Sequence, residues 1–147
     1  MTSVSFSVVG TPVSQGSKKA FRRGAKIVLV ETAAGLSAWR QDVAAMASRA
    51  LDGKPWDPTA PMRVTIAMRF TRPASHFTAS LTLRKGAPSD KTSKPDIDKL
   101  LRAVLDACTG VVWRDDAQVY HVDVRKEWTV GAPGCDVVAV AGEERGT

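Results

Sequence analysis

Four aspartates flank a short helical pattern in residues 94–119, KPDIDKLLRAVLDACTGVVWRDDAQV: Asp96, Asp98, Asp115 and Asp116. Two carboxylates about 4 Å apart repel each other by about 4 kcal/mol at an effective dielectric constant of about 20. Such a cluster is stable when a divalent cation neutralises it, and an all-oxygen ligand set suits Mg²⁺ or Mn²⁺. Because that cation can bind a phosphate oxygen and activate water, the pattern is compatible with phosphoester hydrolysis.

The same aspartates also have an ordinary structural interpretation. An aspartate before a helix is a common N-terminal cap, and two aspartates before a strand form an ordinary turn. Spacing alone leaves both interpretations open. The phosphatase motif that begins D-x-D is excluded, because that motif follows a buried apolar strand, whereas Asp96 follows the polar residues 91–95, KTSKP.

The acidic positions surround one predicted amphipathic helix, residues 99–108. Pro95 disfavours helical structure at the residue before it, which places the D-I-D segment in the turn that leads into the helix. From Asp98 onward, Asp98, Arg102 and Asp106 are four residues apart and share one polar face. The opposite face is predicted to be buried and contains Leu100, Leu101, Val104, Leu105 and Cys108. Asp115 and Asp116 immediately precede a predicted strand, whose tip could return beside the start of the helix.

The rest of the chain predicts a mixed sheet with two main helices. Alternating polar and apolar residues predict strands at 3–9, 62–72, 117–128 and 134–142, and residues 27–30 predict a short buried strand. Helical spacing predicts a first helix, capped by Thr32, with a buried stripe of Leu36, Trp39, Val43, Met46, Ala47 and Ala50. Residues 11–26 and 73–94 are predicted to be exposed basic loops, the second becoming ordered on binding. We therefore predict one α+β domain, residues 1–147, with its helices on one face of the sheet.

The composition is that of a globular protein, with 44% hydrophobic and 24% charged residues among 147. No apolar run approaches the roughly 20 residues that a membrane span requires, and the N-terminus does not resemble a secretory signal. The two cysteines, Cys108 and Cys135, have no metal-ligand spacing. We expect both to be reduced in a cytoplasmic protein that does not enter a membrane.

The formal net charge of +6 is unevenly distributed. Residues 11–40 contain six basic residues and one acid, and residues 63–94 contain seven basic residues and one acid. Basic segments beside a separate acidic cluster suit a metal-dependent enzyme that acts on nucleic acid, although a solvated charged surface is the alternative. The candidate contacts to phosphate are Lys18, Lys19, Arg22, Arg23, Lys26, Arg84, Lys85, Lys91 and Lys94.

About 30 residues of the chain resemble the signature of the RusA family of Holliday junction resolvases, found in bacteria and their phages. That signature is a basic residue, D-x-D, a polar residue and leucine, then a basic residue four positions after the second aspartate, a D-A-L-like helix end, and D-D-x-Q-V. The matching residues are Lys94, Asp96, Asp98, Lys99, Leu100, Arg102, Asp106, Ala107, Cys108, Asp115, Asp116, Ala117, Gln118 and Val119. Two departures occur: Lys99 stands where asparagine is common, and Arg102 stands where the family usually has lysine.

The resemblance implies that Asp96, Asp98 and Asp116 are catalytic residues that bind Mg²⁺, with Mn²⁺ as an alternative. Arg102 keeps the positive charge of the family's lysine but cannot plausibly lose its proton, so we expect it to clamp a phosphate or stabilise developing charge. Asp115 is expected to be a turn residue or an indirect partner. The resemblance further implies a RusA-like fold and a homodimer that cuts paired strands of a four-way DNA junction, leaving 5′-phosphates and 3′-hydroxyls.

Two other functions remain compatible with the sequence. In the first, the protein is a noncatalytic nucleic-acid-binding module whose aspartates serve as caps. In the second, it is a nuclease of the same fold that also cuts flaps or replication forks. His76 and His121 have no partner at a useful spacing, and we expect no catalytic role for either.

Overall fold

A four-stranded mixed sheet forms the body of the protein in the computed structural model, which describes residues 2–16, 18–31 and 34–142. The strands lie in the order β1 (Thr2–Val9), β6 (Gly134–Ala141), β4 (Met62–Thr71) and β5 (Val119–Thr129). β6 is antiparallel to both of its neighbours, and β4 is parallel to β5. The predicted mixed sheet and its four main strands are therefore confirmed.

Alternation along the strands gives the sheet one apolar face. Val4, Phe6 and Val8 of β1 are buried, as are Val64 and Ile66 of β4, while the residues between them face the other way. Because the side chains of a strand alternate between its two faces, this pattern requires cover on one side of the sheet only.

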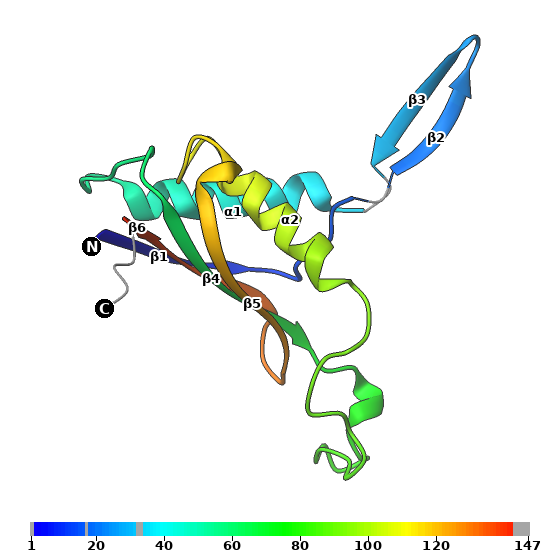
Figure 1. The fold of residues 1–147 in the computed structure, drawn as a ribbon. Coiled ribbons are helices and arrows are strands. Elements are labelled where there is room, and N and C mark those ends of the chain that lie inside the picture. Colours follow the sequence, from blue (N-terminus) through cyan, green and yellow to red (C-terminus); the bar gives the residue numbers. More distant parts are fainter. Residues whose placement is uncertain (1, 17, 32–33, 143–147) are drawn as a thin grey trace.

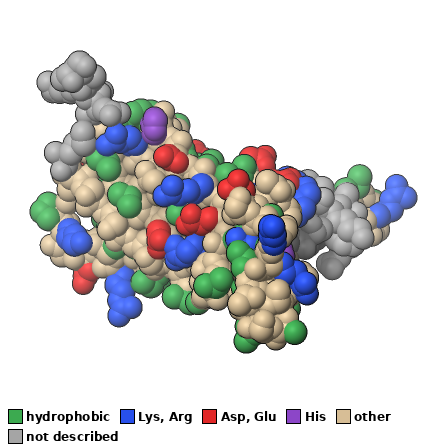
Figure 2. All heavy atoms as spheres, turned by 90° about the horizontal axis from the view of Figure 1, so that it is seen from below, with side chains coloured by type: hydrophobic (Ala, Val, Ile, Leu, Met, Phe, Trp, Pro, Cys, Tyr) green, Lys and Arg blue, Asp and Glu red, His purple; other side chains and the backbone are tan. Residues whose placement is uncertain are grey.

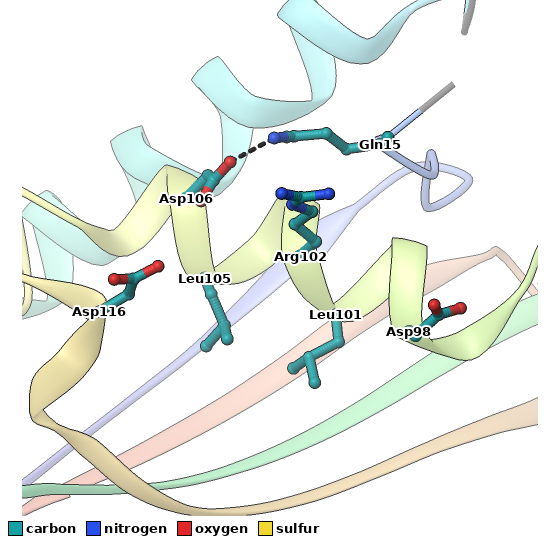
Figure 3. A pocket seen from close by; sticks show the side chains of 8 residues that line it. Gln15, Asp98, Leu101, Arg102, Leu105, Asp106 and Asp116 are labelled. Carbon is teal, nitrogen blue, oxygen red and sulfur yellow. Dashed lines mark hydrogen bonds between the residues drawn. The ribbon is translucent and has the colours of Figure 1, made fainter. Parts of the chain in front are cut away.

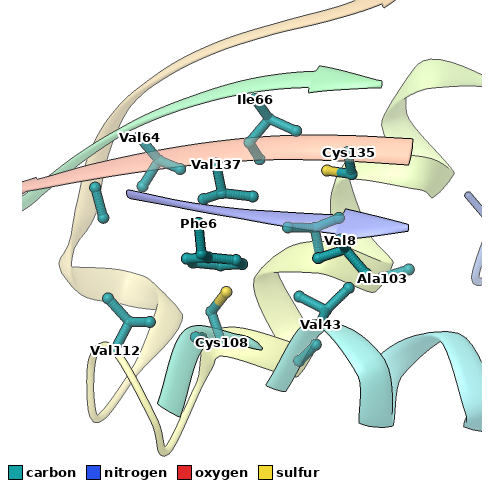
Figure 4. Packing of buried hydrophobic residues seen from close by; sticks show 14 of the residues in the cluster. Phe6, Val8, Val43, Val64, Ile66, Ala103, Cys108, Val112, Cys135 and Val137 are labelled. Carbon is teal, nitrogen blue, oxygen red and sulfur yellow. The ribbon is translucent and has the colours of Figure 1, made fainter. Parts of the chain in front are cut away.

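Two helices supply that cover: α1 (Leu36–Leu51) and α2 (Ile97–Cys108) pack on the same face of the sheet (Figure 1). The core between the layers contains Trp39 and Val43 of α1 together with side chains of α2 and the strands (Figure 4). Cys108 and Cys135 lie in this core as free thiols, and burial raises the pKa of each to about 12. The predicted α+β arrangement is confirmed.

The first helix begins differently from the prediction. Its N-terminal cap is Gly35, which has a φ of 79° and no capping side chain, and the predicted cap, Thr32, lies outside the described residues. Glycine fits this position because a positive φ disfavours residues with a Cβ atom. The predicted buried stripe is confirmed for Leu36, Trp39, Val43 and Ala47.

The basic segment after β1 forms a hairpin rather than the predicted loop. β2 (Lys18–Arg23) pairs antiparallel with β3 (Lys26–Glu31) in a separate two-stranded sheet, and Gly24 turns the chain with a φ of 61°. Figure 1 shows this hairpin projecting away from the body. The prediction of a buried strand at residues 27–30 is correct in its extended backbone but wrong for Ile27, which is 72% exposed.

The second basic segment, residues 72–95, is folded by its own hydrogen bonds. The Arg72 guanidinium donates to the Pro88 carbonyl at 2.7 Å, the Thr78 amide donates to the Thr82 carbonyl at 2.8 Å, and a 3₁₀ helix spans Ala74–His76. The expected loop is therefore present and has defined turns, and its ordering on binding stays a prediction.

The sheet face opposite the helices carries charges of both signs. Arg69 of β4 pairs with Asp136 of β6, and the Ser7 hydroxyl of β1 donates to the same carboxylate at 2.7 Å. The view from below shows acidic and basic side chains interspersed (Figure 2). This view therefore shows no large, uniformly basic surface of the kind that a DNA backbone would favour.

Candidate functional site

Helix α2 separates a buried face from a polar one. Leu100, Val104 and Cys108 have no exposed surface, in agreement with the predicted apolar side. The predicted buried residues Leu101 and Leu105 are only half-buried, because they lie at the border of the polar face and line a cavity.

A cavity of about 580 Å³ lies along this polar face (Figure 3). Asp98, Arg102 and Asp106 line it from α2, as their spacing of four residues predicts. Asp116 reaches it from the 3₁₀ helix Asp116–Gln118, directly before β5. We call this hollow the α2 cavity; its lining residues are Gln15, Gly16, Asp98, Leu101, Arg102, Leu105, Asp106 and Asp116.

The D-D-x-Q pattern has a local structural explanation that separates the roles of its aspartates. The Asp115 carboxylate accepts a hydrogen bond from the Ala117 amide at 2.9 Å, and the Gln118 side chain accepts one from the Asp115 amide at 2.9 Å. This reciprocal capping box begins the 3₁₀ helix. The prediction that Asp115 is a turn residue is confirmed, and Asp116 is the aspartate of the pair that lines the cavity.

Gln118 also ties this turn to the rest of the fold. Its amide nitrogen donates to the Pro58 and Ala60 carbonyls, each at 2.9 Å. The side chain therefore uses its donor and acceptor atoms to hold the turn that carries Asp116 against the connection before β4. This explains in physical terms why glutamine suits the last polar position of the pattern.

Gln15 is a cavity residue that the sequence did not indicate. Its backbone amide donates to the Lys99 carbonyl at 3.0 Å, and its side chain donates to the Asp106 carboxylate (Figure 3). The neighbouring Gly16 has a φ of 114°, and a Cβ atom there would lie 3.6 Å from the Arg102 guanidinium. The chain between β1 and the hairpin is therefore docked on the polar face of α2. Because Gln15 and Asp106 are 91 positions apart, spacing gave no signal for this contact.

Asp96 has different surroundings from Asp98. It is the N-cap of α2, with no side-chain capping bond, and its carboxylate lies 2.7 Å from the Lys94 ammonium and 3.7 Å from that of Lys99. The hydrogen bond from Lys94 lowers the pKa of Asp96 below its ordinary value. Asp96 lines a separate hollow of about 440 Å³, which we call the lysine pocket, formed by Ser14, Lys94, Pro95, Asp96 and Lys99.

The three predicted metal ligands do not converge in this structure. Asp98 and Asp116 lie at opposite ends of the α2 cavity, with Leu101 and Leu105 between them (Figure 3), and Asp96 is paired with lysines outside it. Across residues 2–16, 18–31 and 34–142, no three His, Cys, Asp or Glu side chains form a group that could hold a metal ion. The expected close meeting of three carboxylates is thus corrected, because the turn before β5 returns near Asp106 rather than near the start of α2.

The donor chemistry of the α2 cavity nevertheless suits a hard divalent cation. Asp98, Asp106 and Asp116 offer carboxylate oxygens, which Mg²⁺ and Mn²⁺ prefer, and histidine and cysteine are missing from the lining. Two of the three predicted ligands share this cavity with Arg102. The residue types therefore fit the predicted cation, although the ligand positions do not form a complete binding site.

The predicted DNA-contacting residues fall into three groups. Arg22, Lys26, Arg84, Lys85 and Lys94 are exposed. The side chains of Lys18, Lys19 and Arg23 lie outside the described part of the structure. Lys91 is only 8% exposed, and its ammonium group donates to the Ser93 hydroxyl and the Lys94 carbonyl, so its position contradicts the prediction of an open phosphate contact.

Comparisons of the sequence with known proteins indicate the family of the chain. In the described residues, no helix is long and apolar enough to cross a membrane. The chain is 29% identical over 132 residues to the uncharacterized protein YqaN of Bacillus subtilis (strain 168), an alignment that covers 86% of this chain and 88% of that protein. The sequence model of the family described as endodeoxyribonuclease RusA matches residues 10–138. The chain therefore belongs to the RusA endodeoxyribonuclease family.

Proposed function

We propose that this protein is a divalent-cation-dependent endonuclease that hydrolyses phosphodiester bonds at branch points in DNA, with four-way junctions as its principal substrate. The observation that carries the proposal is the shared cavity of Asp98 and Arg102, from α2, and Asp116, from the turn before β5. Three side chains suited to phosphoryl transfer thus face one hollow in a chain of an endodeoxyribonuclease family.

In this proposal the reaction adds water to a backbone phosphorus and releases the 3′ oxygen, leaving a 5′-phosphate and a 3′-hydroxyl. Asp98 and Asp116 lie at opposite ends of the α2 cavity, so they would hold one cation only after the turn before β5 moves toward the start of α2, and Asp96 would join them after its carboxylate leaves Lys94. A bound Mg²⁺ or Mn²⁺ supplies charge neutralisation and an activated water molecule. The Arg102 guanidinium would stabilise the negative charge that develops on the phosphoryl oxygens.

DNA binding in this proposal rests on exposed basic side chains of the hairpin and of the segment before α2. Arg22 and Lys26 are exposed on the projecting hairpin, and Lys94 is exposed beside the start of α2. Contacts of this kind neutralise backbone phosphates without reading sequence, so we expect binding that weakens steeply with salt.

A homodimer is part of the proposal. A four-way junction has two strands of like polarity to be cut, and a two-fold symmetric dimer would place one α2 cavity at each. Light scattering of the purified protein, alone and with a junction, tests this assembly. A protein that stays a monomer in both conditions would contradict paired cleavage by a dimer.

The separation of Asp96 from Asp98 and Asp116 favours a second candidate function: a binding module in which the aspartates only cap helices and turns. Such a module would bind a junction equally well with EDTA or with Mg²⁺ and would never cut it. A broader nuclease of the same fold would cut flaps and forks as readily as four-way junctions.

The experiment that separates these functions uses the purified chain with three labelled substrates: a synthetic four-way junction, a flap and a linear duplex of the same sequence. Each is incubated with Mg²⁺ and with EDTA. We expect symmetric cuts in the junction with Mg²⁺ only, and little cutting of the duplex. Binding without cutting under all conditions would establish the binding module, and equal cutting of flap and junction would establish the broader nuclease.

A further inference from the structure

Three consecutive carbonyl groups before α2 all accept hydrogen bonds from lysine side chains. The Lys126 ammonium, from β5, donates to the Ser93 carbonyl at 2.8 Å and to the Pro95 carbonyl at 2.9 Å. The Lys91 ammonium donates to the Lys94 carbonyl between them at 2.8 Å and to the Ser93 hydroxyl at 2.9 Å. Two positive charges thus fix the backbone of residues 93–95. We call Lys91 and Lys126 together the lysine clamp.

The surroundings of Lys91 show that it is held inside the fold. Its ammonium group lies 4.7 Å from the centre of the Phe70 ring and 4.4 Å from that of the Trp128 ring. His76 packs edge-on against Trp128 at 5.0 Å. Burial, and then the charge of Lys126, lowers the pKa of Lys91. Cation–π contacts and hydrogen bonds to a carbonyl and a hydroxyl compensate for the removal of this charge from water.

The clamp acts on the backbone that leads into the candidate site. Pro95 is the residue directly before Asp96, the N-cap of α2, and Asp98 lies in the first turn of that helix. The Asp96 side chain makes no capping hydrogen bond, so a side-chain cap does not fix the start of α2. The start of α2 is held instead by the segment before it, by the Gln15 amide, which donates to the Lys99 carbonyl, and by the buried Leu100 side chain. The clamp therefore ties the backbone directly before Asp96 and Asp98 to β5.

We propose that Lys91 and Lys126 are positioning residues: by holding the carbonyls of residues 93–95 they set the placement of Asp96 and Asp98 for phosphodiester cleavage. This inference rests on the proposed function, and it gives both lysines a role other than DNA contact. Their ammonium groups donate hydrogen bonds to backbone carbonyls of this segment.

The test uses Lys126→Met, which keeps the length of the side chain and removes its donors, and Lys126→Arg, which keeps charge and several donors. The matched control is Arg125→Met, which removes the same charge from the next residue of β5, where the side chain is exposed and faces the other side of the strand. Lys91→Met repeats the test on the other half of the clamp. Circular dichroism selects the variants that fold.

Three quantities are measured for each variant: the single-turnover rate on a four-way junction with Mg²⁺, the junction dissociation constant in EDTA, and hydrogen exchange of the backbone amides of residues 93–99 other than Pro95. We expect Lys126→Met to lose about a hundredfold in rate, because a displacement of about 1 Å has effects of this size. Lys126→Met should bind the junction with an affinity within about threefold of the wild type, and the backbone amides of this segment should exchange faster. Lys126→Arg should recover much of the cleavage rate, and Arg125→Met should match the wild type.

Distinct results overturn the inference. If Lys126→Met cleaves at the wild-type rate, or loses rate and junction affinity by the same factor, the clamp does not position the aspartates. If the wild type cuts no branched DNA, the proposed function is wrong. Hydrogen exchange alone then tests whether the lysine clamp holds the backbone of residues 93–95. Unchanged amide exchange of residues 93–99 in both Lys126→Met and Lys91→Met would exclude the clamp. Faster amide exchange confined to this segment would support it.

Discussion

Asp96 and Asp98 are two residues apart and lie in contrasting electrostatic surroundings. Asp96 has extended backbone at the N-cap of α2, and its carboxylate pairs with Lys94 and Lys99 in the lysine pocket. Asp98 is exposed in the first turn and lines the α2 cavity with Arg102 and Asp116. Adjacent acids in a D-x-D motif thus need not share one hollow, because the change from extended to helical backbone between them turns their side chains apart.

The comparison also assigns different tasks to the two hollows. The α2 cavity combines carboxylates with an arginine that keeps its charge, a set suited to binding and transforming a phosphate group. The lysine pocket holds its one carboxylate in ion pairs, and the lysine clamp fixes the backbone beside it. We therefore expect the largest functional losses from changes to the carboxylates and the arginine of the α2 cavity and smaller ones from changes to the lysines of the lysine pocket.

The largest expected effect is that of Asp98→Asn. Loss of a cation-binding carboxylate removes several kcal/mol of charge stabilisation, so single-turnover cleavage of a four-way junction should slow by about a thousandfold or more. Junction binding in EDTA should be unchanged or tighter, since one negative charge near DNA is removed. The matched control is Asp106→Asn, on the same helix face but hydrogen-bonded to Gln15, which should slow cleavage by about tenfold at most. Equal losses of cleavage rate in Asp98→Asn and Asp106→Asn would show that these two acids do not have different roles.

Arg102 should show an intermediate effect that depends on the shape of its side chain. Arg102→Met should lower kcat by about a hundredfold or more, in the range found when one donor to developing negative charge is removed. Arg102→Lys retains a point charge without the planar fork and should lose about tenfold. Cleavage rates measured at saturating and at limiting protein concentrations separate an effect on kcat from an effect on DNA binding. Variants that change the binding affinity alone would show that Arg102 only binds DNA.

A smaller effect should distinguish exposed from buried lysines of the basic segments. Lys26→Gln removes an exposed charge on the hairpin, so the plot of log affinity against log salt should flatten by about 0.9, the value for one neutralised phosphate. Lys91→Met should leave that slope unchanged, because the Lys91 ammonium is buried against Phe70 and Trp128. Fluorescence anisotropy of a labelled junction at several salt concentrations measures both slopes, and identical flattening would mean that Lys91 reaches the DNA.

The smallest expected effect concerns the titration of Asp96. Its pKa lies below the ordinary value of 3.8, mainly because Lys94 donates a hydrogen bond to it, so Lys94→Met should raise that pKa toward 3.8. A carboxyl group with a lowered folded-state pKa contributes stability above its unfolded pKa, and this contribution disappears as the pH falls through the folded pKa. Any difference in stability between wild type and variant from this source should therefore vanish in strong acid. Carbon-13 NMR of the carboxyl group measures the pKa directly, and an unchanged value would exclude the ion pair with Lys94 as its cause.

The sequence predicted the body of the protein well because most of its elements depend on local patterns. Alternation located β1, β4 and β6, and the four-residue spacing of Asp98, Arg102 and Asp106 placed them together on one face of α2. The first strand of the hairpin was missed because residues 11–26 are rich in glycine, serine and basic residues, a composition typical of an exposed loop.

The candidate site was only partly predictable, since its missing contacts join distant parts of the chain. Gln15 meets Asp106 across 91 positions, and Lys126 meets Pro95 across 31, through side chains whose types alone suggest solvent or DNA. Lys91 illustrates the limit most clearly: a lysine in a basic segment predicts phosphate binding, and only the fold places it between two aromatic rings.

In the proposed function, Asp98 and Asp116, from different elements, act as one unit on one phosphodiester. Single-turnover cleavage of a four-way junction by Asp98→Asn, Asp116→Asn and the double variant, followed over hours, tests this directly. Residues that act as a unit are strongly non-additive, so the double variant should be no slower than the slower single variant. A double variant whose loss is the product of the two single losses, or single variants that cut at the wild-type rate, would contradict the account.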